Sequence, residues 1–431
     1  MYFLAQELFE NRYISATTSL LASFSPWIQI MSRHIHENII ILAFTIIMFI
    51  YLIKLLNKFS FKYILLLSIL SGISLFTYHI GKVMSFYFIF SALTITFLKS
   101  KKSWRQLLLV AFLFAVPVIL YGITEIFQPN NRVSNLLFYK NDGFRLSIEE
   151  NLREYPIRVI HNKVTSAVIT LTDKYITYFS PEFLVNKGDA NPRFGYPGIS
   201  PITPIEYIFI GIGIYFLFKN KHKYRFILMS FLLIAPLSAS LAWPEYSLTR
   251  SFTMIIPILL LVSFGFINLI MNTKSRNVQL FLGTTVSLGV IFFVFFTWTF
   301  YFEHYFRRPI PAASWQCGYK DLNKYLIENY DRFDNFYITK KYGQPYIFTL
   351  FFQKYPPSKY QMVAKLGALD EYGFGQVESY DKYHFTFQTP FKHKSSYIGY
   401  LDDFAGTGIP ESKLKIIKYD EESIFYIYEN K

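Results

Sequence analysis

The chain has a single cysteine, Cys317, among its 431 residues. One cysteine excludes an intramolecular disulfide framework and any metal site built from several thiolates. The sequence also has no CxxC, HExxH, Walker A or GxGxxG pattern, so the common metal-binding and nucleotide-binding motifs are missing. The motifs typical of soluble enzymes therefore predict no function for this chain.

Acidic residues are missing from four short segments that together carry thirteen Lys and Arg residues. These segments are 54–62, 99–105, 219–225 and 272–277, and each lies between hydrophobic stretches. In multi-pass membrane proteins, short loops rich in Lys and Arg stay on the cytoplasmic side. The pattern therefore predicts a polytopic membrane protein whose four basic loops lie inside.

The hydrophobic stretches between these loops are long enough to cross about 30 Å of hydrocarbon. Hydrophobic residues make up 52% of the chain, which is more than an average soluble domain contains. Eight stretches are candidate membrane spans, and 14–30 is a weaker ninth. The eight are 38–53, 63–78, 83–98, 107–126, 205–218, 226–242, 251–271 and 279–301.

If the basic loops are inside, the segments between the other span ends fall outside. They are 32–37, 79–82, 127–204, 243–250 and everything after 301. The short outer loops contain only three cations, Arg33, Lys82 and Arg250. The net charge of +14 thus gathers in the inner loops, where membrane insertion and anionic lipid explain it. We expect no nucleic-acid partner.

We predict two domains, a transmembrane bundle over 1–302 and an external α/β domain over 303–431. The bundle includes a long external loop, 127–203, with an amphipathic helix around 148–172. The second domain has a helical pattern at 319–329 and β-rich runs at four places: 336–339, 346–352, 384–389 and 424–428. The predicted fold class is a polytopic α-helical membrane protein of about nine transmembrane helices with a C-terminal extracytoplasmic α/β domain.

Ionisable side chains gather where two predicted spans meet the outer membrane face. A hydrophobic stretch contains Ser25-Pro26-Trp27, and Arg33, His34, His36 and Glu37 follow just before the next span. Ionisable residues near membrane depth are functional candidates. A simpler interpretation is that these residues cap two helices and anchor them at the headgroups. A divalent metal bound by two His and one Glu is a further alternative. It is the one cofactor considered, and no residue is assigned as its ligand.

This segment resembles the second external loop of the GT-C membrane glycosyltransferases, in the bacterial branch related to protein O-mannosyltransferases and the lipid A aminoarabinose transferase. Further segments resemble that family in the same order, so the resemblance spans nearly the whole chain. It implies transfer of a sugar from a polyprenyl-phosphate carrier to an external acceptor, with inversion at the anomeric carbon. The further segments are Thr77-Tyr78-His79, 178–184, 188–193, Leu248-Thr249-Arg250 before a span with Pro257, 315–319 and 343–348.

Such a reaction needs a carboxylate as general base on the acceptor hydroxyl and cations that hold the phosphate as it leaves. Among the outer residues, Glu37 fits the catalytic role, and Arg33, Arg250 and Lys82 fit contacts with the carrier phosphate. Arg250 as a plain interfacial anchor and Lys82 as a snorkelling residue are the alternatives.

Contacts with the donor or acceptor are predicted for His36, His79 and Arg193. Each has a simpler alternative, because histidines beside a helix start often cap it and a loop arginine usually only interacts with solvent. One feature departs from the family. The family places its principal acid in a first external loop, as an Asp followed by another acid, and this chain has no such loop.

Residues 1–9 are typical of the last turns of an earlier helix, so we expect the chain to begin inside the family's fold and to transfer sugar poorly. Three functions remain open. The first is a glycosyltransferase incomplete at its N-terminus, the second a non-catalytic homologue that binds lipid-linked sugar, and the third a transporter or flippase of lipid-linked sugars. Transporters often contain internal repeats and helices broken at mid-membrane, neither of which is evident, so the enzyme is preferred.

The expected partners are the lipid bilayer, a polyprenyl-phosphate-linked sugar donor, and an acceptor that is a protein, a lipid or a polysaccharide. The expected location is the cell membrane, which the chain crosses several times. The C-terminal domain is expected on the extracytoplasmic side, because it follows the last predicted span.

Overall fold

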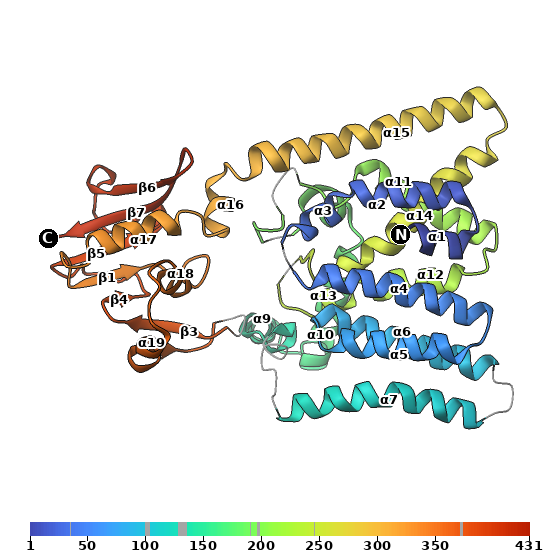
Figure 1. Ribbon diagram of the computed structural model, residues 1–431, viewed down its shortest axis with the longest axis horizontal. Helices are drawn as coiled ribbons and strands as arrows, with labels where there is room; N and C mark the ends of the chain where they lie inside the picture. Colours follow the sequence, from blue (N-terminus) through green and yellow to red (C-terminus); the bar gives the residue numbers. More distant parts are fainter. Residues whose placement is uncertain are drawn as a thin grey trace. The chain divides into compact units, whose positions relative to one another are not determined.

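The computed structural model describes residues 1–34, 36–99, 104–127, 136–189, 191–195, 199–244, 246–370 and 374–431. The chain divides into two compact units, Met1–Trp298 and Thr299–Lys431. The first unit is helical and the second carries a β-sheet (Figure 1). The boundary after Trp298 lies a few residues before the boundary after residue 302 that the sequence predicted.

The first unit is made of helices, most of them apolar. The N-terminal half has α1 (Tyr2–Phe9), α2 (Arg12–Phe24), α3 (Pro26–Ser32), α4 (Asn38–Asn57), α5 (Phe61–Leu75), α6 (His79–Lys99) and α7 (Trp104–Phe127). The rest has η1 (Phe138–Lys140), α9 (Asp142–Glu154), α10 (Lys163–Thr177), η2 (Glu182–Lys187), α11 (Pro204–Lys219), α12 (Arg225–Ile234), α13 (Leu237–Ser240), η3 (Phe252–Met254), α14 (Ile255–Asn272) and α15 (Arg276–Thr299).

Five helical segments among the described residues are long and apolar enough to cross a membrane. Two of them bury little within the protein, since only Val110 and Phe114 of α7 and only Thr297 of α15 are buried. Apolar surface of this extent is rare in water and is typical of contact with lipid or a partner. These helices indicate a membrane protein. The five segments are Asn38–Asn57, His79–Lys99, Trp104–Phe127, Phe252–Asn272 and Arg276–Tyr305.

Some of the nine expected spans are shorter or interrupted. Phe61–Leu75 and Arg225–Ser240 are apolar but fall below that length. The second is interrupted before α13 at Pro236, because proline lacks the N–H that continues a helix. The weak candidate 14–30 is divided at Ser25, whose side chain caps α3 while Pro26 occupies its first turn.

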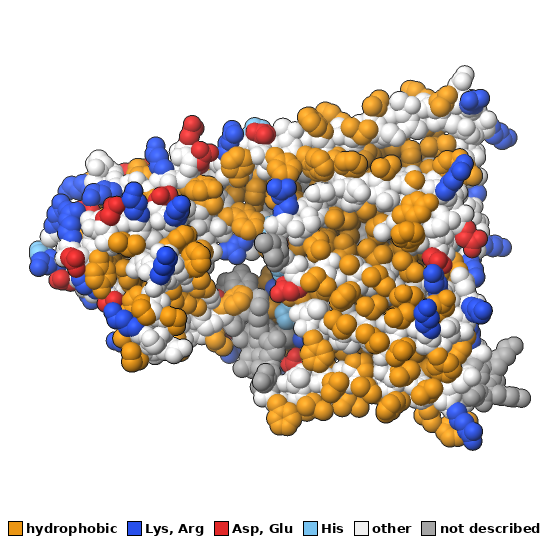
Figure 2. All heavy atoms as spheres, viewed as in Figure 1, with side chains coloured by type: hydrophobic (Ala, Val, Ile, Leu, Met, Phe, Trp, Pro, Cys, Tyr) orange, Lys and Arg blue, Asp and Glu red, His pale blue; other side chains and the backbone are white. Residues whose placement is uncertain are grey.

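One end of the helical unit collects the basic loops. Lys99 Nζ lies 3.3 Å from the Leu55 carbonyl oxygen, and Lys223 Nζ lies 2.6 Å from Asn57 Oδ1. Together with Figure 1, these contacts place the α4–α5, α11–α12 and α14–α15 connections and the C-terminal end of α6 at the same end. Figure 2 shows Lys and Arg side chains along it. Lys101, which was predicted to face the cytoplasm, lies outside the described residues.

Helices α11 and α14 pack backbone against backbone at two glycines. A Cβ atom added at Gly213 would lie 2.1 Å from the carbonyl oxygen of Leu261. One added at Gly265 would lie 2.6 Å from the backbone nitrogen of Gly213. Small residues allow this close approach of helices in membranes, where packing rather than the hydrophobic effect drives association.

Where the sequence predicted one amphipathic helix around 148–172, the described part of the connection between α7 and α11 has two α-helices, α9 and α10. That prediction was wrong in extent. α9 ends at Glu154 and Pro156 follows two residues later, because the residue before a proline is disfavoured in a helix. α10 restarts at Lys163, where the Asn162 side chain accepts hydrogen bonds from two backbone N–H groups.

The second unit contains one mixed sheet of order β2-β3-β4-β1-β5-β7-β6. β1 pairs in parallel with β4 and β5, and the remaining pairs are antiparallel. The strands are β1 (Asn335–Ile338), β2 (Lys365–Gly367), β3 (Gln376–Tyr380), β4 (Tyr383–His384), β5 (Ser395–Gly399), β6 (Lys415–Tyr419) and β7 (Glu422–Asn430). The helices are η4 (Phe300–Tyr305), α16 (Pro309–Ser314), α17 (Tyr319–Glu328), α18 (Pro345–Phe352), α19 (Pro357–Val363), η5 (Leu401–Phe404) and η6 (Glu411–Lys413).

The structure confirms the helix predicted at 319–329 and the strands predicted near 336–339 and 424–428. The strand predicted at 346–352 was wrong, because these residues form α18, with Pro345 in its first turn. The strand predicted at 384–389 was also wrong beyond its first residue. β4 pairs with the short strand β1 only at Tyr383 and His384.

Candidate functional site

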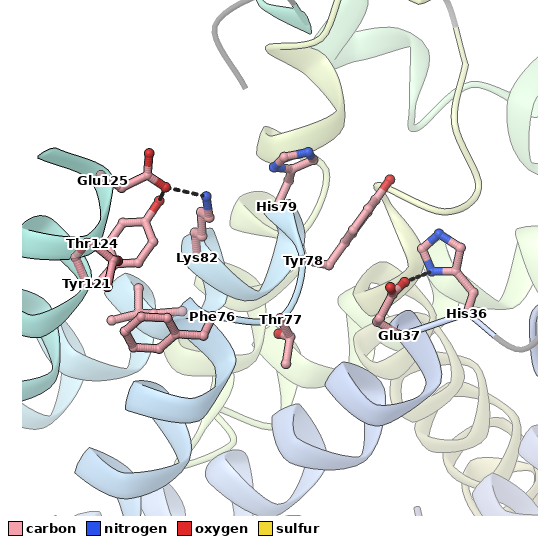
Figure 3. Close-up of a pocket in the computed structure, with 11 residues that line it drawn as sticks. His36, Glu37, Phe76, Thr77, Tyr78, His79, Lys82, Tyr121, Thr124 and Glu125 are labelled. Atoms are coloured by element: carbon pink, nitrogen blue, oxygen red, sulfur yellow. Dashed lines mark hydrogen bonds and ion pairs between the residues drawn. The ribbon is translucent and has the colours of Figure 1, made fainter. Parts of the chain in front are cut away.

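A cavity of about 480 Å³ lies at the ends of four helices of the first unit. It is formed where α4 and α6 begin and where α5 and α7 end, which is the end opposite the basic loops (Figures 1 and 3). Its lining is rich in polar side chains. The lining residues are His36, Glu37, Leu75, Phe76, Thr77, Tyr78, His79, Lys82, Tyr121, Thr124 and Glu125.

The cavity brings together four of the seven residues predicted from the sequence, namely Glu37, His36, His79 and Lys82. These come from two separate segments of the chain, so their meeting is a result of the fold. Arg33, Arg193 and Arg250 are not among the described residues that line it.

Glu37 immediately precedes α4, and its carboxylate faces His36. Glu37 Oε2 lies 3.3 Å from His36 Nδ1, and the Glu37 side chain is 61% exposed. The Asn38 backbone N–H points at the same ring nitrogen, also at 3.3 Å. The His36 ring meets the Tyr78 ring edge-on, with centroids 4.8 Å apart. The carboxylate thus lies beside an imidazole ring and is still accessible to a substrate.

Lys82 and Glu125 form the opposite wall of the cavity. Lys82 Nζ lies 3.4 Å from Glu125 Oε1, and the Tyr121 hydroxyl donates a hydrogen bond to that same oxygen. The ammonium group also lies 4.8 Å from the centre of the Tyr121 ring. A phosphate bound by Lys82 would therefore compete with Glu125 for the ammonium group.

Sequence reasoning missed the contribution of α7, which supplies Tyr121, Thr124 and Glu125 to the lining. A signal was present, because Glu125 is an acid inside the predicted span 107–126. Ionisable residues within membrane spans are expensive and usually have a functional or structural partner. Here the partner is Lys82 on the neighbouring helix α6.

Arg250 lies in a turn, residues 247–251, that is held by three distant segments. The backbone N–H of residue 248 donates to Asp189 Oδ2 at 2.6 Å. The Trp27 indole N–H donates to the carbonyl oxygen of residue 248 at 3.2 Å. The Asn38 amide donates to the carbonyl oxygen of residue 249 at 2.6 Å. The turn is therefore fixed directly beside the start of α4.

Asp189 and Arg250 are close enough to interact electrostatically. Asp189 is buried and also accepts a hydrogen bond from the backbone N–H of Asn191. Burial raises the pKa of Asp189 to about 6, although the two backbone N–H groups and the charge of Arg250 oppose that shift. Arg250 Nε is buried and has no hydrogen-bond partner among the described residues. Buried donors are normally satisfied, so this unpaired donor is an exception in the site.

Arg33 and Arg193 are brought near each other through His34. The His34 ring lies with Nδ1 2.6 Å from the Ile30 carbonyl oxygen and Nε2 3.0 Å from the Arg193 carbonyl oxygen. Burial lowers the pKa of His34, and these two carbonyl contacts oppose the shift. Arg33 is exposed at the end of α3. The segments 30–34 and 191–195 therefore lie side by side.

Metal binding was an open alternative for His34, His36 and Glu37. His34 faces two carbonyl oxygens, and His36 faces Glu37. Within the described ranges, no group of three or more His, Cys, Asp or Glu residues is arranged to hold a metal ion.

No known protein family, curated protein or solved structure matches this chain.

Proposed function

We propose that this protein is a GT-C-type membrane glycosyltransferase that moves a sugar from a polyprenyl-phosphate carrier to an acceptor outside the cytoplasm. One observation carries the proposal. The segments that resemble the family are distant in sequence, yet hydrogen bonds join them at one end of the helical unit. Trp27 contacts residue 248, His34 contacts Arg193, and Asp189 contacts residue 248.

The proposed orientation places that end outside the cell. The basic loops gather at the other end of the unit, and loops rich in Lys and Arg remain in the cytoplasm. In this arrangement the shorter helices α5, α11 and α12–α13 also cross the membrane, and with α2–α3 the number of spans reaches about nine. The second unit follows α15 and is then extracytoplasmic.

Glu37 is the proposed general base. Its exposed carboxylate takes the proton of the acceptor hydroxyl while the acceptor oxygen attacks the anomeric carbon from the side opposite the phosphate. The bond between the anomeric carbon and the phosphate oxygen breaks, and its electron pair stays on the phosphate. The anomeric configuration is thereby inverted. The His36 ring lies beside this carboxylate.

The carrier phosphate needs cations at the same end of the unit. Arg250 supports this role because its buried Nε has no hydrogen-bond partner among the described residues. A guanidinium group can bind two phosphate oxygens at once. Arg33 and Lys82 are the further candidates, with Lys82 leaving Glu125 when phosphate binds. Stabilising the charge on the leaving phosphate lowers the barrier to transfer.

The first test is the substitution Glu37→Gln in the full chain, reconstituted with a polyprenyl-phosphate sugar donor. Loss of a general base typically lowers the rate by about a hundred-fold to ten thousand-fold. Glu7→Gln is the matched control, because Glu7 also pairs with a basic residue, Lys54, but at the other end of α4. Equal transfer rates for Glu37→Gln and Glu7→Gln would contradict the assignment.

Binding of lipid-linked sugar without transfer is the second candidate. It is favoured by the two carboxylates of the cavity, Glu37 and Glu125, which both lie close to a nitrogen of a basic side chain. A chain of this kind binds the carrier with Arg250 but transfers no sugar to protein, lipid or polysaccharide acceptors. Measuring donor binding and sugar release on the same reconstituted sample separates the two functions.

A further inference from the structure

One segment of the second unit, residues 345–369, combines exposed apolar side chains with lysines. It includes α18, α19 and β2, and it contains three Lys residues and no Asp or Glu. Phe351, Met362 and Leu366 are 73%, 79% and 75% exposed. We call the exposed side of this segment the basic–apolar face. Its apolar members are Ile347, Phe351, Met362, Val363, Leu366 and Leu369.

Among the described residues of the unit, the core is built from other side chains than those of this face. The core of the second unit takes other side chains of the same segment, including Phe348, Phe352, Tyr355 and Tyr360. Tyr355 and Tyr360 pack against Tyr380 of β3, with ring centroids 5.0 and 5.5 Å away. α18 and α19 therefore have one apolar side that is buried and another that is exposed.

The sheet edge at this face is also open. β2 is an edge strand of only three residues with an irregular register toward β3. The opposite edge, β6, carries the exposed lysines Lys415 and Lys418. Charged residues on an edge strand discourage pairing with other chains. On β2, Lys365 stands beside Leu366, which is 75% exposed and therefore more exposed than the apolar residues Ile416 and Tyr419 of β6.

The segment itself carries only positive charges, while acids beside it, such as Glu378 and Asp381, belong to neighbouring segments. Lys354 and Lys365 are exposed. Lys359 is only weakly compensated, since its Nζ lies 3.8 Å from Asp381 Oδ2. Apolar side chains among cations are typical of segments that lie in the headgroup region of a membrane and are attracted by anionic lipid. Figure 2 shows hydrophobic side chains beside Lys and Arg side chains on this unit.

A membrane surface is within reach of this unit. The unit starts at Thr299, where α15 ends, and α15 belongs to a segment that can cross a membrane. Residues 299–308, even if fully extended at about 3.3 Å each, reach no more than about 33 Å. A tether of this length keeps the unit at a high effective concentration near the bilayer surface.

We propose that the basic–apolar face docks on the surface of the membrane that the chain crosses, with Phe351, Met362 and Leu366 among the acyl chains and the lysines among anionic headgroups. The proposal is independent of sugar transfer. Docking of this kind would fix the orientation of the second unit relative to the bilayer. It also explains why apolar residues remain exposed on α18, α19 and β2.

The test uses the full chain in lipid nanodiscs, with Cys317→Ser removing the single native cysteine. Met362→Cys is labelled with bimane, and the discs contain phospholipids brominated on their acyl chains. Lys418→Cys is the matched control, because it is exposed on β6 at the other edge of the same sheet. We expect brominated lipid to reduce bimane fluorescence at least twofold at position 362 and to leave position 418 unchanged.

A second set of discs varies the headgroup. Replacing anionic lipid by phosphatidylcholine, or combining Lys354→Gln with Lys365→Gln, is expected to reduce quenching at position 362. Absence of quenching at position 362 would overturn the proposal. A disulfide between two Met362→Cys chains in one disc would overturn it as well, because the face would then be covered by a second copy. If neither the replacement of anionic lipid nor the two lysine substitutions reduces quenching, the proposed role of the lysines would be overturned.

Discussion

Asp189 connects the fold of the long loop to the candidate site. Its two carboxylate oxygens accept hydrogen bonds from the backbone of Asn191 and Leu248. The second bond connects the long loop before α11 to the turn that carries Arg250. A buried carboxylate with these bonds positions a cation without exposing itself to solvent.

Asp189 should make stability depend on pH. Its folded-state pKa of about 6 is above the ordinary value of 3.8, so the folded protein takes up a proton between these pH values and the unfolded chain does not. The contribution of Asp189 to stability is therefore largest below about pH 4 and is lost as the pH rises to about 6. We therefore expect the melting temperature of the wild type, measured relative to that of Asp189→Asn, to increase as the pH falls from about 6 to about 4.

The matched control is Asp173→Asn, which changes an exposed carboxyl on α10. The difference between its melting temperature and that of the wild type should stay constant over the same pH range. A constant difference for Asp189→Asn as well would show that this carboxyl does not take up a proton there.

Arg250 should contribute to carrier binding through the shape of its guanidinium group as well as its charge. Arg250→Ala removes both, while Arg250→Lys keeps a point charge and loses the planar fork. A charge-assisted hydrogen bond contributes about 1.5–3 kcal/mol, so we expect binding of polyprenyl phosphate to weaken about tenfold or more in Arg250→Ala and less in Arg250→Lys. Arg276→Ala, at the basic end, is the control. Normal binding by Arg250→Ala would remove this residue from the phosphate site.

The close contact between α11 and α14 depends on the absence of a side chain at Gly213. Gly213→Ala would place a methyl group against the backbone of Leu261, and overpacking of this kind costs about 1–3 kcal/mol. Gly211→Ala, on the same helix, meets nothing within 4 Å and gains about 1 kcal/mol of helix propensity. We expect Gly213→Ala to lower the melting temperature in detergent and Gly211→Ala to leave it unchanged or raise it. Equal melting temperatures would mean that the two helices can separate at no cost.

At the scale of elements, the sequence predicted what depends on composition and missed what depends on context. The long apolar runs of α4, α6 and α14 are evident from hydrophobicity alone. Residues 346–352 were mistaken for a strand because Phe, Ile and Tyr have high β propensity. Their helical state follows from Pro345 and from packing of Phe348 against Tyr319, with centroids 4.4 Å apart. No local sequence pattern predicts that contact.

The candidate site was predictable in part for the same reason. Glu37 and His36 are neighbours in sequence, and their pairing follows from the end of one helix and the start of the next. The pairing of Lys82 with Glu125 spans 43 residues and needs α6 and α7 to lie side by side. The bond from Asn38 to the turn before Arg250 spans 211 residues. Only the fold determines such contacts.

The orientation of the whole molecule has a decisive test because α15 stands between two exposed lysines. Lys274 precedes α15 at the basic end, and Lys418 lies in the second unit that follows it. The native Cys317 is a poor reporter, since burial raises the pKa of its thiol and the thiolate is the reactive form. Lys274→Cys and Lys418→Cys, each in a Cys317→Ser background, avoid this difficulty.

If α15 crosses the membrane, the two engineered cysteines lie on opposite sides of it. The bias of Lys and Arg toward the cytoplasm then decides which is inside. We expect a membrane-impermeant thiol reagent to label Lys418→Cys in intact cells and to label Lys274→Cys only after the membrane is breached. Labelling of both in intact cells would show that α15 does not span. The reverse pattern would place the cavity with Glu37 in the cytoplasm, where the proposed extracytoplasmic transfer cannot occur.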